Sequence, residues 1–347
     1  MARKLSLYEV EDGMILAEDV VDEVTGNVLM PKDSVLDFAS KNRLENYHVH
    51  SVLIVDTNDE EKDSILMNAV LTESYNAIEE ELVGIYEDLK SGKEIYFSED
   101  DNKFEILSRE AAEENDILSQ LYLLKNKDDY TYNHGMGVGV LAAKLGGWLN
   151  LSANDIKKLS IAGTFHDIGK VKIDDSIVFK RGPLTDEEYE EIKKHPQHSY
   201  DIVKEYSDYD QDILDAIHHH HERLDGSGYP HGLKGDEISM FARIIGVCDV
   251  YHAIISNRVY KPKDSPFKAA RILRESSFQH LDPYVVRVFL DNISRFYVGN
   301  KVLLSDGRKG TIVYIDQVDR DAPVVKVGEE FIDFKVRRDI KILEITI

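Results

Sequence analysis

The chain has 347 residues, of which 42% are hydrophobic, enough for two or three domains with a buried core. Its formal net charge of -23 at pH 7 argues against binding of a DNA or RNA polymer, because affinity for a phosphate backbone comes mainly from Lys and Arg, but a small phosphorylated ligand is not excluded. The single cysteine, Cys248, excludes an intrachain disulfide, and no apolar run reaches the length of a signal peptide or of a membrane span, so we expect a cytoplasmic protein that does not enter the membrane.

Residues 1–57 alternate short apolar runs with turn residues. Val20–Val21 and Val28–Met30 flank a turn at Thr25–Asn27, and Ser51–Val55 is rich in β-branched residues. This pattern predicts a small N-terminal α/β or mainly β module.

Residues 58–125 are expected to form a helical connector. The segment begins with a polar linker at residues 58–63, after which apolar residues recur at three- and four-residue spacing, a helical pattern: Ile78, Leu82, Ile85, Tyr86 and Leu89. The apolar stripe either packs within the chain or supports a homodimer.

The rest of the chain divides into a long helical region and a short β region. Helical patterns occupy residues 130–295 and are broken by the Gly- and Pro-containing segment 225–235. In residues 297–347, three strands are expected at 301–304, 310–315 and 324–327, separated by Asp/Gly turns. We therefore predict a mainly α fold, with a helical core between a small N-terminal α/β module and a small C-terminal β module.

Two carboxylates in the helical region end apolar segments. His166 and Asp167 follow Leu159–Phe165, and Asp249 ends a second apolar stretch. Burying an ionised carboxylate costs several kcal/mol unless a cation pairs with it. Lys170, one helical turn after Asp167, is one such partner, and a metal ion is the other.

Histidines gather in the same region. His134 shares a helical face with apolar residues, and His195 stands alone; either could be an ordinary core or surface residue. The internal run His218–His221 would repel itself if every imidazole were charged, so neutral, metal-binding imidazoles are the more economical explanation. Imidazoles combined with two carboxylates suit hard or borderline divalent metals.

Five separated stretches resemble the HD-GYP subgroup of the HD phosphohydrolase superfamily: His134, His166–Lys170, His195, His220–Pro230 and Asp249. The run His-His-Glu-Arg-Leu-Asp-Gly-Ser-Gly-Tyr-Pro is the most specific part, and the similarity covers about residues 126–296. The resemblance implies an all-helical HD-type bundle and hydrolysis of cyclic di-GMP to linear pGpG or GMP. The N-terminal module is also similar to one that accompanies this domain.

The resemblance further implies two divalent metal ions, with iron as the expected metal and manganese as its substitute. One ion would be held by His134, His166, Asp167 and Asp249. The other would be held by His195, His220 and His221, with Asp167 bridging the pair. His218 and His219 lie outside the family pattern and are expected at the surface or beside the ligands.

A hydroxide shared by two such cations would attack the phosphodiester phosphorus. Asp167, Lys170 and Tyr229 are the catalytic candidates. Lys170 is assigned to the phosphate, with a salt bridge to Asp167 or Asp249 as an equal alternative. The remaining candidates for substrate binding come from the glycine-rich loop and the segment after Asp249: Gly228, Tyr229, Pro230, Arg258 and Lys261.

The loop and the last two residues also have plainer explanations. The loop glycines suit a tight turn, and Arg258 and Lys261 suit a solvated helix end. The chain departs from the family at Tyr130, where some relatives have a Glu for a third metal, and at His252 and Asn257, where acids are frequent. Two metals are therefore the better expectation, and turnover and substrate preference are open at this stage.

Three alternatives remain at the sequence level. The first is a phosphodiesterase for another cyclic dinucleotide, such as a GMP–AMP hybrid. The second is a metal-containing sensor with little turnover, for which His252 leaves room. The third, a scaffold with incidental histidines, predicts no bound metal. The terminal modules are expected to recognise a protein partner or regulate access, but nothing in them identifies one.

Overall fold

The computed structural model describes residues 2–346 except for 8–9, 11–13, 22–27, 33, 37–39, 42–43, 45–46, 48, 50, 56–68, 96, 98–101, 115–116, 119–120, 122–129, 257–265, 279, 317–318 and 321. The expected turn at Thr25–Asn27 and the expected linker at residues 58–63 lie outside the described residues. The chain separates into two compact units, residues 1–68 and residues 69–347. The four-part division proposed from the sequence stays a proposal.

The N-terminal unit is built from short antiparallel strands. β1 (Ala2–Ser6) pairs with β4 (Ser51–Val55), and β2 (Val20–Val21) pairs with β3 (Val28–Met30). Apolar side chains from these strands and from the segments between them form a small core that includes Leu16, Leu36, Leu44 and Ile54. The strand expected at residues 51–55 is confirmed, and the apolar runs at residues 20–21 and 28–30 also form strands.

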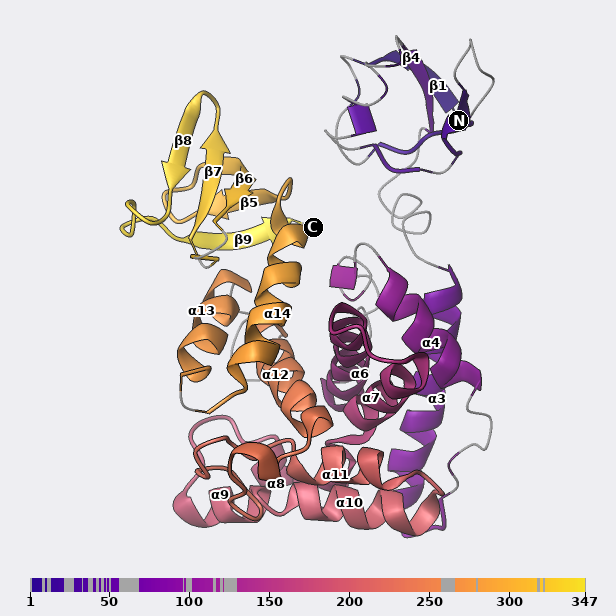
Figure 1. Ribbon diagram of the computed structural model, residues 1–347, viewed down its shortest axis with the longest axis vertical. Helices are drawn as coiled ribbons and strands as arrows, with labels where there is room; N and C mark the ends of the chain where they lie inside the picture. Colours follow the sequence, from indigo (N-terminus) through magenta and orange to yellow (C-terminus); the bar gives the residue numbers. More distant parts are fainter. Residues whose placement is uncertain are drawn as a thin grey trace. The chain divides into compact units, whose positions relative to one another are not determined.

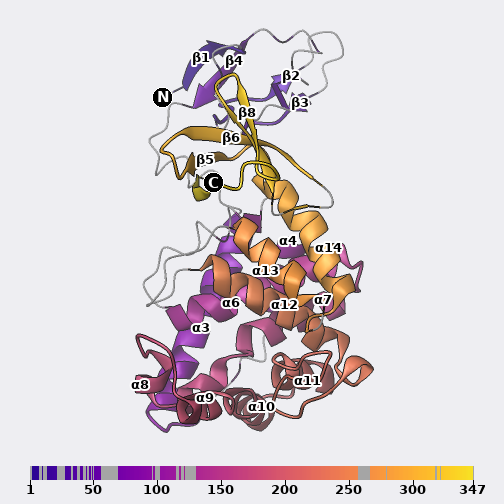
Figure 2. The ribbon, with the colours of Figure 1, turned by 90° about the vertical axis from the view of Figure 1, so that its left-hand side faces the viewer.

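The second unit has a helical core. Its longer helices are α3 (Ala69–Lys90), α4 (Asn102–Glu113), α6 (Tyr130–Trp148), α7 (Ala153–Phe165), α10 (His195–Tyr206), α11 (Gln211–His219), α12 (Met240–Ile255), α13 (Pro266–Ser276) and α14 (Pro283–Ile293). Shorter helical segments are η1 (Ile168–Lys172), α8 (Asp175–Val178), α9 (Asp186–Ile192), η2 (Gly235–Glu237) and η3 (Ser294–Tyr297). The helices α6 and α7 run through the middle, and α8 to α11 gather at one end of the bundle (Figures 1 and 2).

Side-chain caps set where several helices begin. Ser152 accepts a hydrogen bond from the backbone N–H of Asp155 at the start of α7, and Ser239 accepts one from Ala242 at the start of α12. Each cap satisfies a backbone donor that the helix itself leaves unpaired. The caps therefore fix the ends of two helices that carry candidate ligands.

The apolar stripe of α3 is buried inside this unit. Ile78 and Leu82 are each 1% exposed, and α3 packs against α4 and α6. Packing within the chain thus accounts for the stripe, which gives no support to a homodimer.

The C-terminal part of this unit is a five-stranded antiparallel sheet in the order β8-β7-β6-β5-β9. Its strands are β5 (Lys301–Leu304), β6 (Lys309–Ile315), β7 (Pro323–Val327), β8 (Glu330–Asp333) and β9 (Ile342–Thr346). The three expected strands are confirmed, and β8 and β9 were not predicted. The mainly α fold with small β modules at both ends is confirmed. No helix among the described residues is long and apolar enough to span a bilayer.

Candidate metal centre

The candidate ligands come from five separated segments of the second unit. His134 lies in α6, His166 and Asp167 at the junction of α7 and η1, His195 at the start of α10, His220 and His221 just after α11, and Asp249 in α12. His166 and His220 are fully buried, and the side chain of His221 is the most exposed of the set at 18%. The fold therefore brings together the residues that the sequence singled out.

The ligand atoms form two groups that share Asp167. The inner group, as we name it, consists of His134, His166 and Asp167; the second group consists of Asp167, His195, His220 and His221. Within each group, the nitrogen and oxygen atoms lie within 4.8 Å of one another. Asp249 adjoins the inner group, with its Oδ1 atom 3.1 Å from His134 Nε2 and 4.0 Å from His166 Nε2.

Backbone carbonyls orient three of the imidazoles. The Nδ1 atoms of His166, His195 and His220 each donate a hydrogen bond to the carbonyl oxygen three residues earlier, at distances of 2.7, 2.7 and 2.6 Å. A carbonyl oxygen only accepts, so the proton of each neutral ring is assigned to Nδ1. The lone pair therefore sits on Nε2, the atom that faces the site, as in histidines that bind metals.

With the ring protons on Nδ1, no proton lies between the Nε2 atoms that face each other in the site. His195 Nε2 and His220 Nε2 are 3.3 Å apart, and burial lowers the pKa of both imidazoles, so both are neutral near pH 7. His166 Nε2 is buried and has no hydrogen-bond partner among the described residues. Lone pairs that face each other in a buried site call for a cation, and nitrogen and carboxylate donors together fit a borderline divalent metal.

The two carboxylates remain ionised in the folded chain. Burial by itself raises the pKa of Asp167, but the charged groups beside it, the Lys170 ammonium among them, outweigh burial and hold the pKa well below its usual range. For Asp249, burial is likewise outweighed, chiefly by His134, whose Nε2 atom lies 3.1 Å from Asp249 Oδ1, and the pKa of this carboxyl also lies well below its usual range.

Lys170 supplies a positive charge beside the shared carboxylate. Its ammonium lies 2.5 Å from Asp167 Oδ2. This salt bridge to Asp167 is one of the two roles that the sequence left open for Lys170. One lysine cannot neutralise both carboxylates, so a site with two ionised acids and neutral imidazoles keeps a net demand for cations.

His134 is oriented differently from the other imidazoles. Its Nδ1 atom lies 3.0 Å from Nδ1 of His252, which is itself 3.3 Å from Ser256 Oγ. Gly137, one turn after His134, makes room for the His252 ring, because a Cβ atom at Gly137 would lie 2.1 Å from His252 Nε2. His252, a departure from the family pattern, thus contacts a candidate ligand directly.

The glycine-rich loop packs against the second group. The Tyr229 ring stacks on His221, with centroids 4.7 Å apart, and burial raises the pKa of its phenol, so the phenol stays protonated. Gly228 is required by its own chain, because a Cβ atom there would lie 2.4 Å from Glu222 Cα. Pro230 follows Tyr229 through a cis peptide bond.

Some candidates cannot be placed. Arg258 and Lys261, and with them Asn257, lie outside the described residues. Tyr130 begins α6, but its side chain is not described.

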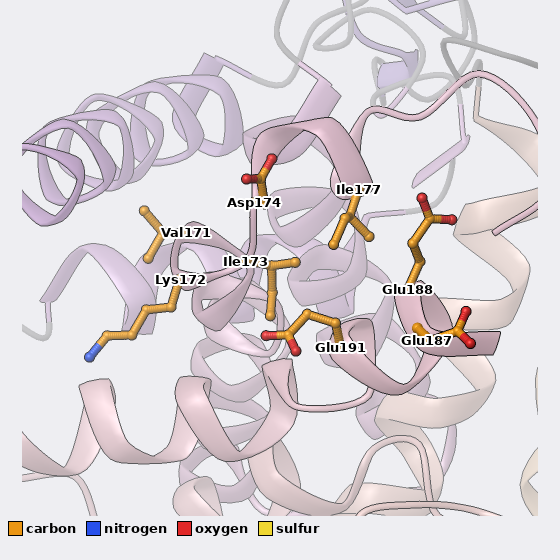
Figure 3. Close-up of a pocket in the computed structure, with 8 residues that line it drawn as sticks. All are labelled: Val171, Lys172, Ile173, Asp174, Ile177, Glu187, Glu188 and Glu191. Atoms are coloured by element: carbon orange, nitrogen blue, oxygen red, sulfur yellow. The ribbon is translucent and has the colours of Figure 1, made fainter. Parts of the chain in front are cut away.

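A pocket of about 660 Å³ lies next to η1, on the side of α8 and α9 (Figure 3). Four carboxylates line it, from Asp174, Glu187, Glu188 and Glu191, against the single ammonium of Lys172. This balance of charge repels an anion, so the pocket does not suit a phosphodiester, and it contains none of the candidate ligands.

Comparison with known proteins agrees with the geometry. A family model described as the HD domain matches residues 110–285, about half of the chain. The chain belongs to the HD domain family. The matched residues include His166, which belongs to the inner group, and Asp167, which belongs to both ligand groups.

Several curated relatives of this HD domain chain are cyclic dinucleotide phosphodiesterases. A cyclic di-GMP phosphodiesterase of Pseudomonas aeruginosa is 35% identical over 67% of this chain and 56% of its own length. A cyclic di-GMP phosphodiesterase of Thermotoga maritima is 34% identical over 58% and 52% of the two chains. A 3'3'-cGAMP-specific phosphodiesterase of Vibrio cholerae is 34% identical over 52% and 43%. The chain thus spans about half the length of these relatives.

Proposed function

We propose that the chain is a metal-dependent phosphodiesterase that hydrolyses cyclic di-GMP to linear pGpG, GMP or both. The observation that carries the proposal is the position of Asp167, which belongs to both groups of ligands. A carboxylate with two oxygen atoms can contact two cations at once, and paired divalent cations about 3.5–4 Å apart are a common solution for phosphodiester hydrolysis.

The proposed ligands are His134, His166, Asp167 and Asp249 for one cation and Asp167, His195, His220 and His221 for the other, with iron as the expected metal and manganese as its substitute. When bound, the pair supplies Lewis-acid polarisation of the phosphoryl oxygens and lowers the pKa of water towards neutrality. The carbonyl-oriented imidazoles keep their lone pairs in place beforehand, so little reorganisation is needed.

Lys170 is proposed to bind the phosphate. In the ligand-free chain its ammonium pairs with Asp167, a carboxylate that the cations would neutralise. The Lys170 side chain is 27% exposed, and its ammonium would then be free to turn to the non-bridging oxygens of the substrate. Tyr229, whose phenol keeps its proton, would form one wall of the site and donate a hydrogen bond, while the roles of Gly228, Pro230, Arg258 and Lys261 stay predictions.

A hybrid GMP–AMP dinucleotide is the second candidate substrate, because one of the relatives described above is specific for it. The test is to purify the chain without oxygen, count its metal ions, and compare hydrolysis of cyclic di-GMP and 3'3'-cGAMP. We expect about two ions per chain and faster turnover of cyclic di-GMP. Full metal occupancy without turnover of either compound would support a sensor instead.

Asp167→Asn tests the shared carboxylate. Removing one charge while keeping the shape should lower metal content by at least one ion and abolish hydrolysis. Asp175→Asn is the matched control, because Asp175 is a 62% exposed carboxylate in α8 whose partner is Lys90. If Asp167→Asn keeps both its metal and its activity, the assignment of the site is wrong.

A further inference from the structure

Three histidines outside both ligand groups form a cluster of their own, which we call the outer histidine cluster. His218 and His219 lie in the last turn of α11, and His231 lies in the loop that follows Tyr229 and Pro230. One ring nitrogen from each lies within 4.8 Å of the others. The proposed phosphodiesterase site uses none of these three residues.

A relay of hydrogen bonds fixes the tautomer of His218. Gln197 donates from its side-chain nitrogen to Asp201 Oδ1 at 2.8 Å, which leaves its Oε1 atom as the acceptor for His218 Nε2, also at 2.8 Å. The His218 proton is therefore on Nε2, and the lone pair is on Nδ1. This is the arrangement of a metal-binding histidine whose other nitrogen is held by an oxygen acceptor.

Ring packing holds His218 further. The ring, 8% exposed, lies between Tyr200 and His219, with stacked centroids at 4.6 and 4.7 Å. His231 meets it edge-on, with centroids 4.8 Å apart and planes at 82°. The side chains of the other two histidines are more accessible, so an ion from solvent can reach the cluster.

The carboxylate of Glu222 places His231 over the end of α11. It accepts hydrogen bonds from the backbone N–H groups of His231, Gly232 and Leu233, at 2.7, 3.1 and 3.0 Å. Glu222 is only 4% exposed, so this part of the loop is held before any ion binds. The approach of His231 to α11 is thus built into the fold.

We propose that the outer histidine cluster binds a borderline divalent cation such as Zn²⁺ through the three imidazoles, with a fourth position left to water. Zinc accepts three imidazole nitrogens at about 2.0–2.1 Å in a tetrahedral site, which places the nitrogens about 3.3 Å apart. The nitrogens lie within 4.8 Å of one another here, so the more exposed rings of His219 and His231 would turn towards the ion, and His219 would leave its stack on His218. The ion would tie the end of α11 to the loop that carries Tyr229.

Zinc stoichiometry tests the proposal, measured by equilibrium dialysis of the full chain followed by elemental analysis. The wild-type chain is expected to bind one more zinc ion than the His219→Ala and His231→Ala variants. His198→Ala, which removes a partly exposed histidine of α10 outside the cluster, should bind as much zinc as the wild type. If wild type and both cluster variants bind equal amounts, the proposal is overturned.

The test does not depend on the proposed phosphodiesterase site. The wild type and the variants share every proposed ligand of that site, and only the difference in zinc bound per chain is compared. The variants His219→Gln and His231→Gln, which keep side-chain bulk and polarity, serve if an alanine variant folds poorly. Hydrogen exchange supplies a second readout. Zinc should slow exchange of the amides of residues 231–233 in the wild type and in His198→Ala but not in the cluster variants, and equal slowing in all of them would contradict the site.

Discussion

At the residue scale, backbone carbonyls decide which nitrogen of His166, His195 and His220 carries the proton. Each ring lies at the end or start of a helix, where carbonyls are free to accept bonds from outside the helical ladder. His134 lies inside α6, and its Nδ1 atom lies 3.0 Å from Nδ1 of the His252 side chain.

His252→Ala tests this arrangement. Loss of the partner should let the His134 ring rotate and lower the affinity for the ion of the inner group about 10- to 100-fold, measured by competition with a chelator. His252→Asp, which restores an acceptor for His134 Nδ1, should recover most of the affinity. His198→Ala is the control. Unchanged affinity in His252→Ala would mean that the contact does not orient His134.

The dependence of stability on pH follows from the buried imidazoles. Burial lowers the pKa of His134, His195, His220 and His221 below 6.5 in the folded chain. The unfolded chain therefore binds protons that the folded chain does not, and the free energy of unfolding falls as the pH drops below about 6.5. Asp167 and Asp249, with pKa values well below 3.8, lose their contribution only at much lower pH.

We accordingly expect the Tm of the metal-free chain to fall between about pH 7 and pH 5. In His220→Gln, which removes one of these imidazoles, the fall should be shallower. Thermal unfolding followed by circular dichroism measures both. Parallel curves for the two chains would contradict the neutral, buried state of His220.

The candidate ligands could be identified from the sequence because they belong to a specific motif that is recognisable without coordinates. The sequence could not show how they are oriented. The contact between His134 and His252 joins residues 118 positions apart, and the separation of His218 and His219 from His220 depends on where α11 ends. The shared position of Asp167 was expected from the resemblance, and the geometry is compatible with it.

At the scale of elements, the closeness of α6 and α7 depends on glycines. A Cβ atom on Gly163 would lie 2.8 Å from Gly139 Cα and N, and one on Gly135 would lie 2.4 Å from Thr164 O. Small residues on both helices let the backbones touch, and this contact sets His134 beside His166, whose rings are 5.2 Å apart.

Gly163→Ala should therefore destabilise the chain, by about 1–3 kcal/mol if the helices separate to relieve the overlap, and should lower metal occupancy. Gly84→Ala is a matched control in α3, where a Cβ atom meets nothing within 4 Å; it should stabilise the chain by about 0.5–1 kcal/mol. Urea unfolding measures both changes. Destabilisation of the same size in the two variants would refute the role of the glycine contact.

Helices were easier to predict than the last strands. The periodic apolar residues of α3, α7 and α12 extend over several turns, so the helical pattern is repeated often enough to recognise. β8 has only four residues, among which Phe331 is 62% exposed and Ile332 is buried. One buried apolar residue is too short an alternation to indicate a strand, and β8 acquires its structure from pairing with β7.

At the scale of the whole molecule, every candidate ligand lies in the second compact unit. The N-terminal unit has its own small core and contributes none of the proposed ligands. Residues 69–347 alone are therefore expected to retain the same number of metal ions per chain as the full protein, measured by elemental analysis. Loss of metal from a truncated chain that keeps its helical circular dichroism would show that residues 1–68 support the site.

The proposed site requires Asp167 to be shared by two cations. Anomalous diffraction from crystals of the chain purified without oxygen, at energies on either side of the iron edge, locates the cations. We predict two peaks, one among His134, His166 and Asp249 and the other among His195, His220 and His221, with the Asp167 carboxylate between them. A single peak, or peaks away from Asp167, would rule out the shared carboxylate.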